Sequence, residues 1–257
     1  MVSTQIRYQT DESDRTKLTI LKNRFAGQRC VIIGNGPSLN DVSLKLLKDE
    51  HTFGVNSIFL KQDSEAFVPS FYVIEDNHVV EDNIDRINVF ADKPDYCFFP
   101  ARYKRDIRGS ENTIFFDCDY GFYWDSHPFG GIPRFSRDAS EVLFAGQSVT
   151  HINFQLAYYL GFSEVYLIGM DFNYTKPSSV IVEGNTLTST EDDPNHFDPS
   201  YFGKGKKWHD PKIDLVALNY QKAKQVFEAN GRKILNATAG GGLEIFPRVE
   251  YESVFSN

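Results

Sequence analysis

The sequence predicts an α/β protein with a mostly parallel sheet and flanking helices, a Rossmann-like arrangement, and two observations support this prediction. Short apolar runs typical of buried strands alternate along the chain with segments whose apolar residues recur at helical spacing. The stretches between successive strand candidates are too long for hairpins, so we expect the strands to run parallel through crossover connections.

The clearest local unit is the run Val31–Ile33, which passes directly into Gly34-Asn35-Gly36. We expect a buried strand, a sharp glycine turn and then a helix capped by Ser38. Two further helices are expected over about Ser148–Leu160 and Asp214–Asn230, each closed by a glycine. Further strands are expected at Thr52–Asn56, Phe71–Ile74, Asp95–Phe99, Thr113–Phe116, Glu164–Ile168 and Lys233–Leu235.

The chain divides into an extension, a domain and an insert. Residues 1–28 are polar and mixed in charge, and we expect an N-terminal extension with a helix around Arg15–Phe25. Residues 29–257 are expected to fold as a single α/β domain, since a chain of this length can bury one large core. Residues 173–213 hold four prolines and many polar residues with little periodicity. An irregular insert of this length is usually functional, so we expect a lid.

Composition narrows the class of partner and the compartment. The net charge of −8 and the pI near 5.3 argue against nucleic acid. The three cysteines are far apart and are expected to be buried free thiols, in keeping with a reducing cytoplasm. Neither a transmembrane segment nor a signal peptide is visible, so we expect a soluble, cytoplasmic protein. Peripheral membrane contact is left open, and the many aromatic residues leave room for a homo-oligomer.

Polar residues follow four of the strand candidates. Gly34-Asn35-Gly36 follows the first, Asn56 ends the second, Asp76 with Asn77 follows the third, and Asp171 follows the sixth. Because the carboxyl ends of parallel strands lie at one edge of a sheet, we expect these groups to converge on one ligand. The glycines would let a phosphate or nucleotide approach the main chain, and N–H groups of the following helix would bind its charge.

Each of these residues also has a purely structural interpretation. The glycine turn matches neither the dinucleotide fingerprint nor a P-loop, and it could simply need a positive φ at Gly34 or Gly36. Asn35 either donates its amide to a phosphate or sugar oxygen or tolerates a left-handed turn, and Asn56 is similar. Asp171 either accepts from ribose hydroxyls or caps the following turn.

Three further features could bind a ligand or take part in a reaction. Ser148 and Thr150 open a helix, where they would bind an anion or only cap the helix. His196 and His209 lie in the expected lid; they offer no zinc site, but a single histidine over a nucleotide is a suitable general base. Asp117-Cys118-Asp119 matches the Asp-x-Asp pattern that holds a divalent cation in many nucleotide-sugar transferases, or it is two solvated acids at a strand end.

Three blocks of the sequence, in this order, are similar to the bacterial sialyltransferases of glycosyltransferase family 42: Val31–Leu39, Leu160–Phe172 and His209–Leu218. The stretch Asn236–Pro247 resembles the broader motility-accessory-factor glycosyltransferases of flagellin, also known as domain of unknown function 115. Together the resemblance covers about residues 29–250. The first block alone is shared with an archaeal branch of pterin diphosphokinases.

The resemblance implies a variant of the GT-A nucleotide-sugar transferase fold with a lid, a CMP-activated nonulosonic acid as the donor, and no metal or other cofactor. Gly34 and Asn35 would lie against the donor phosphate and sugar, and Asn56 would also reach the donor. Asp171 would lie near the nucleoside, and His209 matches the histidine proposed as general base in the sialyltransferases. The rest of the expected donor site consists of Gly36, Ser38, Asp76, Ser148 and Thr150.

The sequence departs from this family at two places. The sialyltransferases carry a tyrosine directly after the Gly-x-Asp-Phe block to hold the leaving phosphate, whereas this chain has Asn173 and then Tyr174. Tyr174 or Tyr201 is expected to supply the phenol. A Thr-Ser-Gly that opens a helix in the family corresponds only approximately to Gly146–Thr150 here.

We therefore expect a metal-independent, inverting glycosyltransferase that moves a sialic-type acid from a CMP-sugar to a glycan or protein acceptor, as in flagellin or lipopolysaccharide glycosylation. Two alternatives are left open. One is an ATP-dependent diphosphokinase of the pterin type, with Mg²⁺ held by Asp117 and Asp119. The other is a non-catalytic nucleotide-binding accessory protein of glycan or flagellar assembly.

Overall fold

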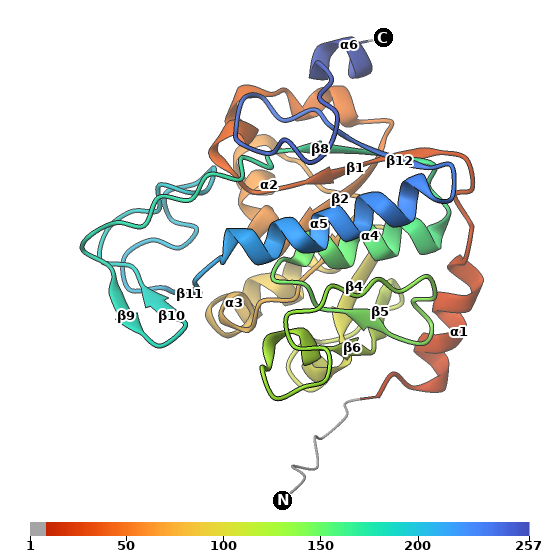
Figure 1. The fold of residues 1–257 in the computed structure, drawn as a ribbon, viewed down its shortest axis with the longest axis horizontal. Helices are drawn as coiled ribbons and strands as arrows, with labels where there is room; N and C mark the ends of the chain where they lie inside the picture. Colours follow the sequence, from red (N-terminus) through yellow and green to blue (C-terminus); the bar gives the residue numbers. More distant parts are fainter. Residues whose placement is uncertain (1–8, 257) are drawn as a thin grey trace, which may run out of the picture.

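The computed structural model describes residues 9–256 and is built on a seven-stranded, all-parallel sheet in the order β12-β8-β1-β2-β3-β4-β5 (Figure 1). The strands are β1 (Arg29–Ile33), β2 (His51–Val55), β3 (Phe71–Val73), β4 (Tyr96–Pro100), β5 (Thr113–Phe116), β8 (Glu164–Ile168) and β12 (Lys233–Asn236). The predicted α/β class with a parallel sheet is confirmed, and every expected strand is found within two residues of its expected bounds.

Helices cover both faces of the sheet, so the protein has three layers (Figure 1). One face is covered by α1 (Glu12–Leu21), α4 (Val149–Leu160) and α5 (Ile213–Glu228). The other is covered by α2 (Phe59–Glu65), α3 (Asn77–Phe90) and α6 (Tyr251–Phe255). Successive residues of β1 alternate between the two cores: Cys30 and Ile32 face α4, and Val31 and Ile33 face the opposite layer. Covering on both faces explains the nearly continuous apolar runs in the strands.

The α-helix expected after the glycine turn is not formed. Two 3-10 helices, η1 (Pro37–Asp41) and η2 (Leu44–Leu47), take its place. Val42 between them is extended, with φ −121° and ψ 148°, and this breaks the helical path. The cap expected at Ser38 is therefore wrong, because Gly36 occupies the N-cap position and Ser38 lies inside η1.

The two other expected helices are confirmed as α4 and α5. Ser148 caps α4 and its side chain accepts from the N–H of Thr150, while Gly161 ends the helix in the left-handed region at φ 100°. The N-terminal helix begins earlier than expected, and Leu18 and Leu21 of α1 lie in the core beneath α4. The helices α2, α3 and α6 had no corresponding expectation.

Residues 173–213, which we expected to be irregular, contain a three-stranded antiparallel sheet in the order β11-β10-β9 that projects from the main body (Figure 1). Its strands are β9 (Ile181–Glu183), β10 (Thr186–Thr188) and β11 (Lys207–His209). A two-residue turn, Gly184-Asn185, joins β9 to β10, with Gly184 at φ 64°. A two-residue turn that begins with glycine, between two short runs rich in β-branched residues, is typical of a β-hairpin. The polar, proline-containing composition of the whole segment made this local pattern easy to miss.

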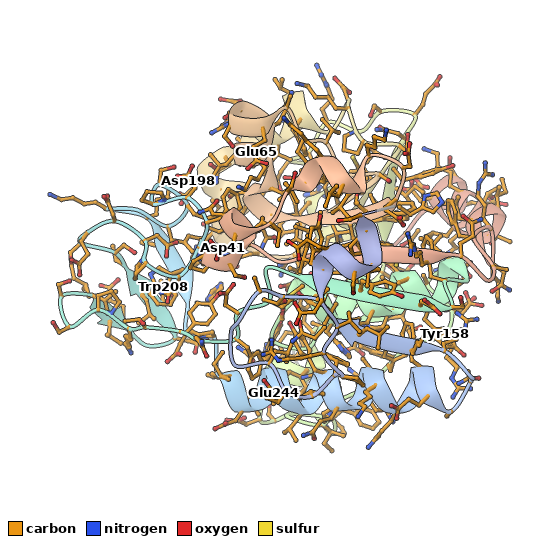
Figure 2. The ribbon with its side chains drawn as sticks, turned by 90° about the horizontal axis from the view of Figure 1, so that it is seen from above. Asp41, Glu65, Tyr158, Asp198, Trp208 and Glu244 are labelled. Atoms are coloured by element: carbon orange, nitrogen blue, oxygen red, sulfur yellow. The ribbon has the colours of Figure 1, made fainter. Side chains whose placement is uncertain are left out.

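The segment 173–213, which we continue to call the lid, is held against the main sheet by hydrogen bonds. The N–H of Phe197 donates to the carbonyl of Asn35 at 2.9 Å, and the Asn40 side chain donates to the carbonyl of Phe197 at 2.8 Å. The Phe197 ring is buried in the core that lies beneath α2 and α3. Figure 2 shows the lid, labelled at Asp198, extending from the end of the body that carries Asp41. This part of the lid is thus a fixed wall of the domain.

The remaining elements are short. They are η3 (Asn56–Ile58), η4 (Ala101–Tyr103), η5 (Gly121–Tyr123), β6 (Cys118–Asp119) and β7 (Leu143–Phe144). All three cysteines are free thiols as expected, with Cys30 and Cys97 buried and Cys118 partly buried. Among residues 9–256, no helix is long and apolar enough to cross a bilayer.

Candidate functional site

A cavity of about 1280 Å³ lies at the carboxyl ends of the central strands, against the lid. It adjoins the β1–β8 pair. The strand order reverses there, since β2 to β5 follow on one side of β1, and β8 and β12 on the other. Parallel sheets bind ligands at such a topological switch point. Its volume exceeds the roughly 300–1000 Å³ of an ordinary small-molecule site, so two reactants can share it. The residues of the expected donor site and the expected base that line it are Gly34, Asn35, Gly36, Asn56, Asp76, Ser148, Thr150, Asp171, Tyr174, Tyr201 and His209. Asn77, His196 and both acids of the Asp-x-Asp motif, Asp117 and Asp119, line it as well.

The glycines after β1 are required by close packing against the loop after β8. The N–H groups of Gly34 and Gly36 donate to the carbonyls of Ile168 and Gly169 at 2.8 and 2.9 Å. A Cβ at Gly34 would overlap the Gly169 carbonyl, and a Cβ at Gly36 would overlap the carboxylate of Asp171. Neither Gly34 nor Gly36 has a positive φ, so that structural interpretation is wrong. The glycine turn holds two loops together, and its N–H groups are already paired.

The anion site expected at the start of the helix after β1 is filled by the protein's own carboxylate. Ser38 donates to Asp171 from its N–H at 3.3 Å and from its hydroxyl at 2.7 Å. Ser38 does not line the cavity. A ligand phosphate must therefore be bound by other donors. The Asp171 carboxylate accepts hydrogen bonds from the first turn of η1 instead.

Replacing Gly36 with alanine is expected to lower the free energy of unfolding by about 1–3 kcal/mol, because the new methyl group forces Asp171 and the loop after β8 away from β1. Gly109→Ala is the matched control, since a Cβ there makes only an ordinary contact with Phe115 at 3.5 Å. Denaturant unfolding of both variants measures the difference. Equal stability of the two variants would show that the loops are not in contact.

Asn35 and Asn56 line the cavity at the carboxyl ends of β1 and β2, which we call the crest of the sheet. Asn35 uses both protons of its side-chain NH₂, donating to the carbonyl of Val55 at 3.0 Å and to the Tyr201 hydroxyl at 2.8 Å. The side-chain oxygens of Asn35 and Asn56 are buried and have no hydrogen-bond partner among residues 9–256. The expected donation from the Asn35 amide to a ligand is therefore replaced by an unpaired acceptor, which suits a ligand hydroxyl or N–H. The left-handed conformation, considered for Asn35, is found at Asn56 with φ 48°.

The first turn of α4 faces the cavity. Ser148 caps the helix and its hydroxyl lies 3.3 Å from the Tyr220 hydroxyl. The Thr150 hydroxyl points to the sulfur of Met170 at 3.8 Å. Both residues line the cavity, as do Gln147 and Val149 between and beside them. The positive end of the α4 dipole is thus directed at the cavity.

His209 lies at the end of β11 and is held against the β3–α3 junction. Its Nε2 is 3.1 Å from the side-chain oxygen of Asn77, and its ring stacks on that of His78 at 4.5 Å. Partial burial lowers the pKa of His209 below its usual value, the charges of His78 and Arg102 add to this, and Asp76 opposes it. The ring is therefore neutral at neutral pH, which is the form a general base needs.

The two candidate tyrosines differ in their availability. Tyr201 is buried, and its hydroxyl accepts from Asn35 and lies 3.5 Å from the N–H of Ser57. Tyr174 is 44% exposed and borders His196 edge to face. Tyr174 is thus the phenol that a ligand can reach without disturbing the fold.

Two groups in the cavity were not predicted as such, although His196 in the second of them is one of the two histidines noted in the expected lid. Glu75 and Arg102 both line the cavity; burial raises the pKa of Glu75 to about 7, and the Arg102 guanidinium lies over the Tyr103 and Tyr120 rings. In the lid, Asp193 pairs with His196, which also lines the cavity. In the sequence, only its position next to Asp76 indicates that Glu75 belongs to the site. The spacing of Asp193 and His196 matches no known sequence motif of a functional site.

The acids of the Asp-x-Asp motif are paired with arginines. Asp117 lies 3.3 Å from Arg15 and accepts from the N–H of Thr10. Asp119 lies 2.7 Å from Arg134. Within residues 9–256 no group of three or more His, Cys, Asp or Glu side chains is placed to hold a metal ion. The motif therefore serves ion pairing in this structure.

Comparison with known proteins places a family model over most of the chain. The model described as "6-hydroxymethylpterin diphosphokinase MptE-like" matches residues 5–177, more than half of the sequence. The match covers the sheet from β1 to β8 and the glycine turn. No curated protein and no solved structure matches.

Proposed function

Since the chain belongs to the MptE-like family, one of the domain-of-unknown-function-115 families, we propose that it is a glycosyltransferase that moves a sialic-type nonulosonic acid from its CMP ester to a hydroxyl of a glycan or protein. One observation carries the proposal. His209 and the crest residues Asn35 and Asn56 line a single cavity whose size suits a donor and an acceptor together.

The reaction needs a base for the acceptor and stabilisation for the departing phosphate. The acceptor oxygen attacks the anomeric carbon, its proton passes to the neutral imidazole of His209, and the bond from the sugar to the phosphate of CMP breaks. Attack opposite to the leaving group inverts the anomeric centre. An oxocarbenium-like transition state forms readily in such a sugar, so no metal is required in this proposal. The N-terminus of α4 and the Tyr174 phenol stabilise the charge that develops on the phosphate.

In this proposal, hydrogen-bond acceptors at the carboxyl ends of β1 and β2 and the walls of the cavity hold the donor. The unpaired oxygens of Asn35 and Asn56 accept from hydroxyl or N–H groups of the donor. Asp171 and Asp76 border the same cavity, with Asp76 close enough to act on the charge of His209. The anchored lid excludes water from the reacting centre and limits hydrolysis of the donor.

A thermal-shift screen against CMP, CDP, UDP, GDP and ATP, with and without Mg²⁺, tests the proposed donor. We expect CMP to raise the melting temperature without Mg²⁺, since a ligand at 100 times its Kd stabilises the folded state by about 2.7 kcal/mol. Stabilisation by ATP with Mg²⁺ alone would contradict a CMP-sugar donor. Cytidine serves as the phosphate-free control.

The name of the family favours a second candidate, an ATP-dependent diphosphokinase acting on a pterin. Such an enzyme uses Mg²⁺, and Asp117 and Asp119 would have to leave Arg15 and Arg134 to bind it. Activity that survives a chelator would exclude this candidate.

A further inference from the structure

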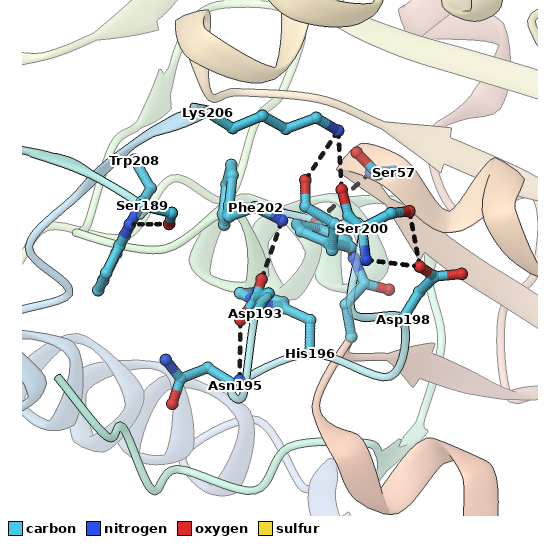
Figure 3. Close-up of polar contacts among 12 residues, drawn as sticks. Ser57, Ser189, Asp193, Asn195, His196, Asp198, Ser200, Phe202, Lys206 and Trp208 are labelled. Carbon is cyan, nitrogen blue, oxygen red and sulfur yellow. Dashed lines mark hydrogen bonds and ion pairs between the residues drawn. The ribbon is translucent and has the colours of Figure 1, made fainter. Parts of the chain in front are cut away.

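The lid carries an aspartate–histidine pair that the proposed reaction has not used. The Nδ1 of His196 lies 2.7 Å from a carboxylate oxygen of Asp193, and both side chains are at least nine-tenths buried (Figure 3). Asp193 also accepts from the N–H groups of Asn195 and Phe202 at 2.8 and 3.0 Å. Although burial opposes it, the hydrogen bond from His196 keeps the pKa of Asp193 below its usual value. The carboxylate is therefore ionised and fixed in place.

The histidine ring is fixed as firmly as its partner. It stacks on the Tyr201 ring at 4.0 Å with an interplanar angle of 3°. Tyr201 in turn accepts from Asn35 at the crest of β1. Because Asp193 takes the Nδ1–H, Nε2 is the ring nitrogen left to meet a ligand in the cavity that His196 lines. A histidine oriented in this way is typical of a group that touches a substrate.

We propose that His196, oriented by Asp193, binds the phosphate of the nucleotide through Nε2–H. The other anion sites at the crest are occupied, since the N–H groups of Gly34 and Gly36 are paired and Ser38 binds Asp171. His196, bordered by Tyr174, lies at this edge of the cavity. Because its Nδ1–H is given to Asp193, donation from Nε2 to a phosphate requires the imidazolium form, whose hydrogen bond to the phosphate is charge-assisted. The inference rests on the proposed function only in taking a nucleotide as the ligand.

Calorimetry with matched pairs of nucleoside 5′-monophosphate and nucleoside tests this role. CMP with cytidine and AMP with adenosine are titrated into the wild type, H196A and H196Q, together with the control S200A. Ser200 is exposed on the same segment, lies outside the cavity and bonds Asp198. We expect H196A to weaken the monophosphate about tenfold or more and to leave the nucleoside unchanged, as loss of one charge-assisted hydrogen bond predicts. H196Q, which keeps an N–H donor, should retain part of the affinity, and S200A all of it.

The outcomes separate this role from a structural one and from the proposed reaction. If H196A and H196Q weaken monophosphate and nucleoside equally, His196 only supports the lid and the inference is wrong. It is also wrong if the phosphate adds nothing to binding by the wild type. If AMP shows the expected pattern and CMP does not, the phosphate role stands and the CMP-sugar donor is wrong.

Discussion

Replacing His209 with alanine is expected to lower the rate of sugar transfer by at least about 100-fold while CMP binds with nearly unchanged Kd, because a positioned general base contributes about 10²–10⁴ to the rate. The ring is hydrogen-bonded to Asn77 and stacks on His78, both at the β3–α3 junction, so we expect its removal to leave the glycine turn intact. Transfer is measured as CMP released in the presence of acceptor, and CMP binding by calorimetry.

Because burial lowers the pKa of His209, kcat/KM in the wild type should fall toward acid with an apparent pKa below that of free histidine.

Lys207→Ala is the matched control for this variant. Lys207 lies on the same strand, β11, with its side chain exposed, so its loss tests whether β11 tolerates substitution. Full turnover by H209A would show that His209 is not the general base. A loss of CMP binding equal to the loss of turnover would make it a binding residue.

Acidification from pH 7.5 to 5 is expected to lower the free energy of unfolding by about 2 kcal/mol through His151 alone. Complete burial within α4 lowers the pKa of His151 to about 4, and the opposing bond to the Arg134 carbonyl is weaker. Its unfolded pKa is near 6.5, so the unfolded state takes up the proton first and stability is lost as the pH falls below that value. Denaturant unfolding at several pH values measures the slope.

His151→Gln removes the titrating group and keeps an N–H donor toward the Arg134 carbonyl. We expect its stability to change much less with pH over this range, whatever its stability at pH 7.5. An unchanged slope would mean that His151 does not control acid unfolding. This variant also separates the acid limb of the activity profile from acid unfolding driven by His151.

The sheet could be predicted because its strands are short, apolar and buried on both faces, which is a strong local signal in Val31–Ile33 or Glu164–Ile168. The convergence of the crest residues also followed from the rule that parallel strands end together. The caps Ser148 and Gly161 could be recognised since their chemistry is local.

What could not be predicted depends on contacts between distant segments. The role of Gly36 as a seat for Asp171 brings together residues more than a hundred positions apart, and no local pattern reveals it. The orientation of the Asn35 amide is likewise set by Tyr201 in the lid. The α3 helix contains a non-helical residue, Asn83, in its interior, and no glycine closes it at Ala91, so the signals that mark a helix end are missing.

A crystal structure of the protein with CMP bound tests the central claim most directly, which is that the reacting centre lies between the crest of β1–β2 and His209. We expect the nucleotide in the cavity, within hydrogen-bond distance of Asn35 or Asn56, and its phosphate facing the space in front of the His209 ring. A nucleotide bound outside this cavity, or held with its phosphate turned away from His209, would contradict the account.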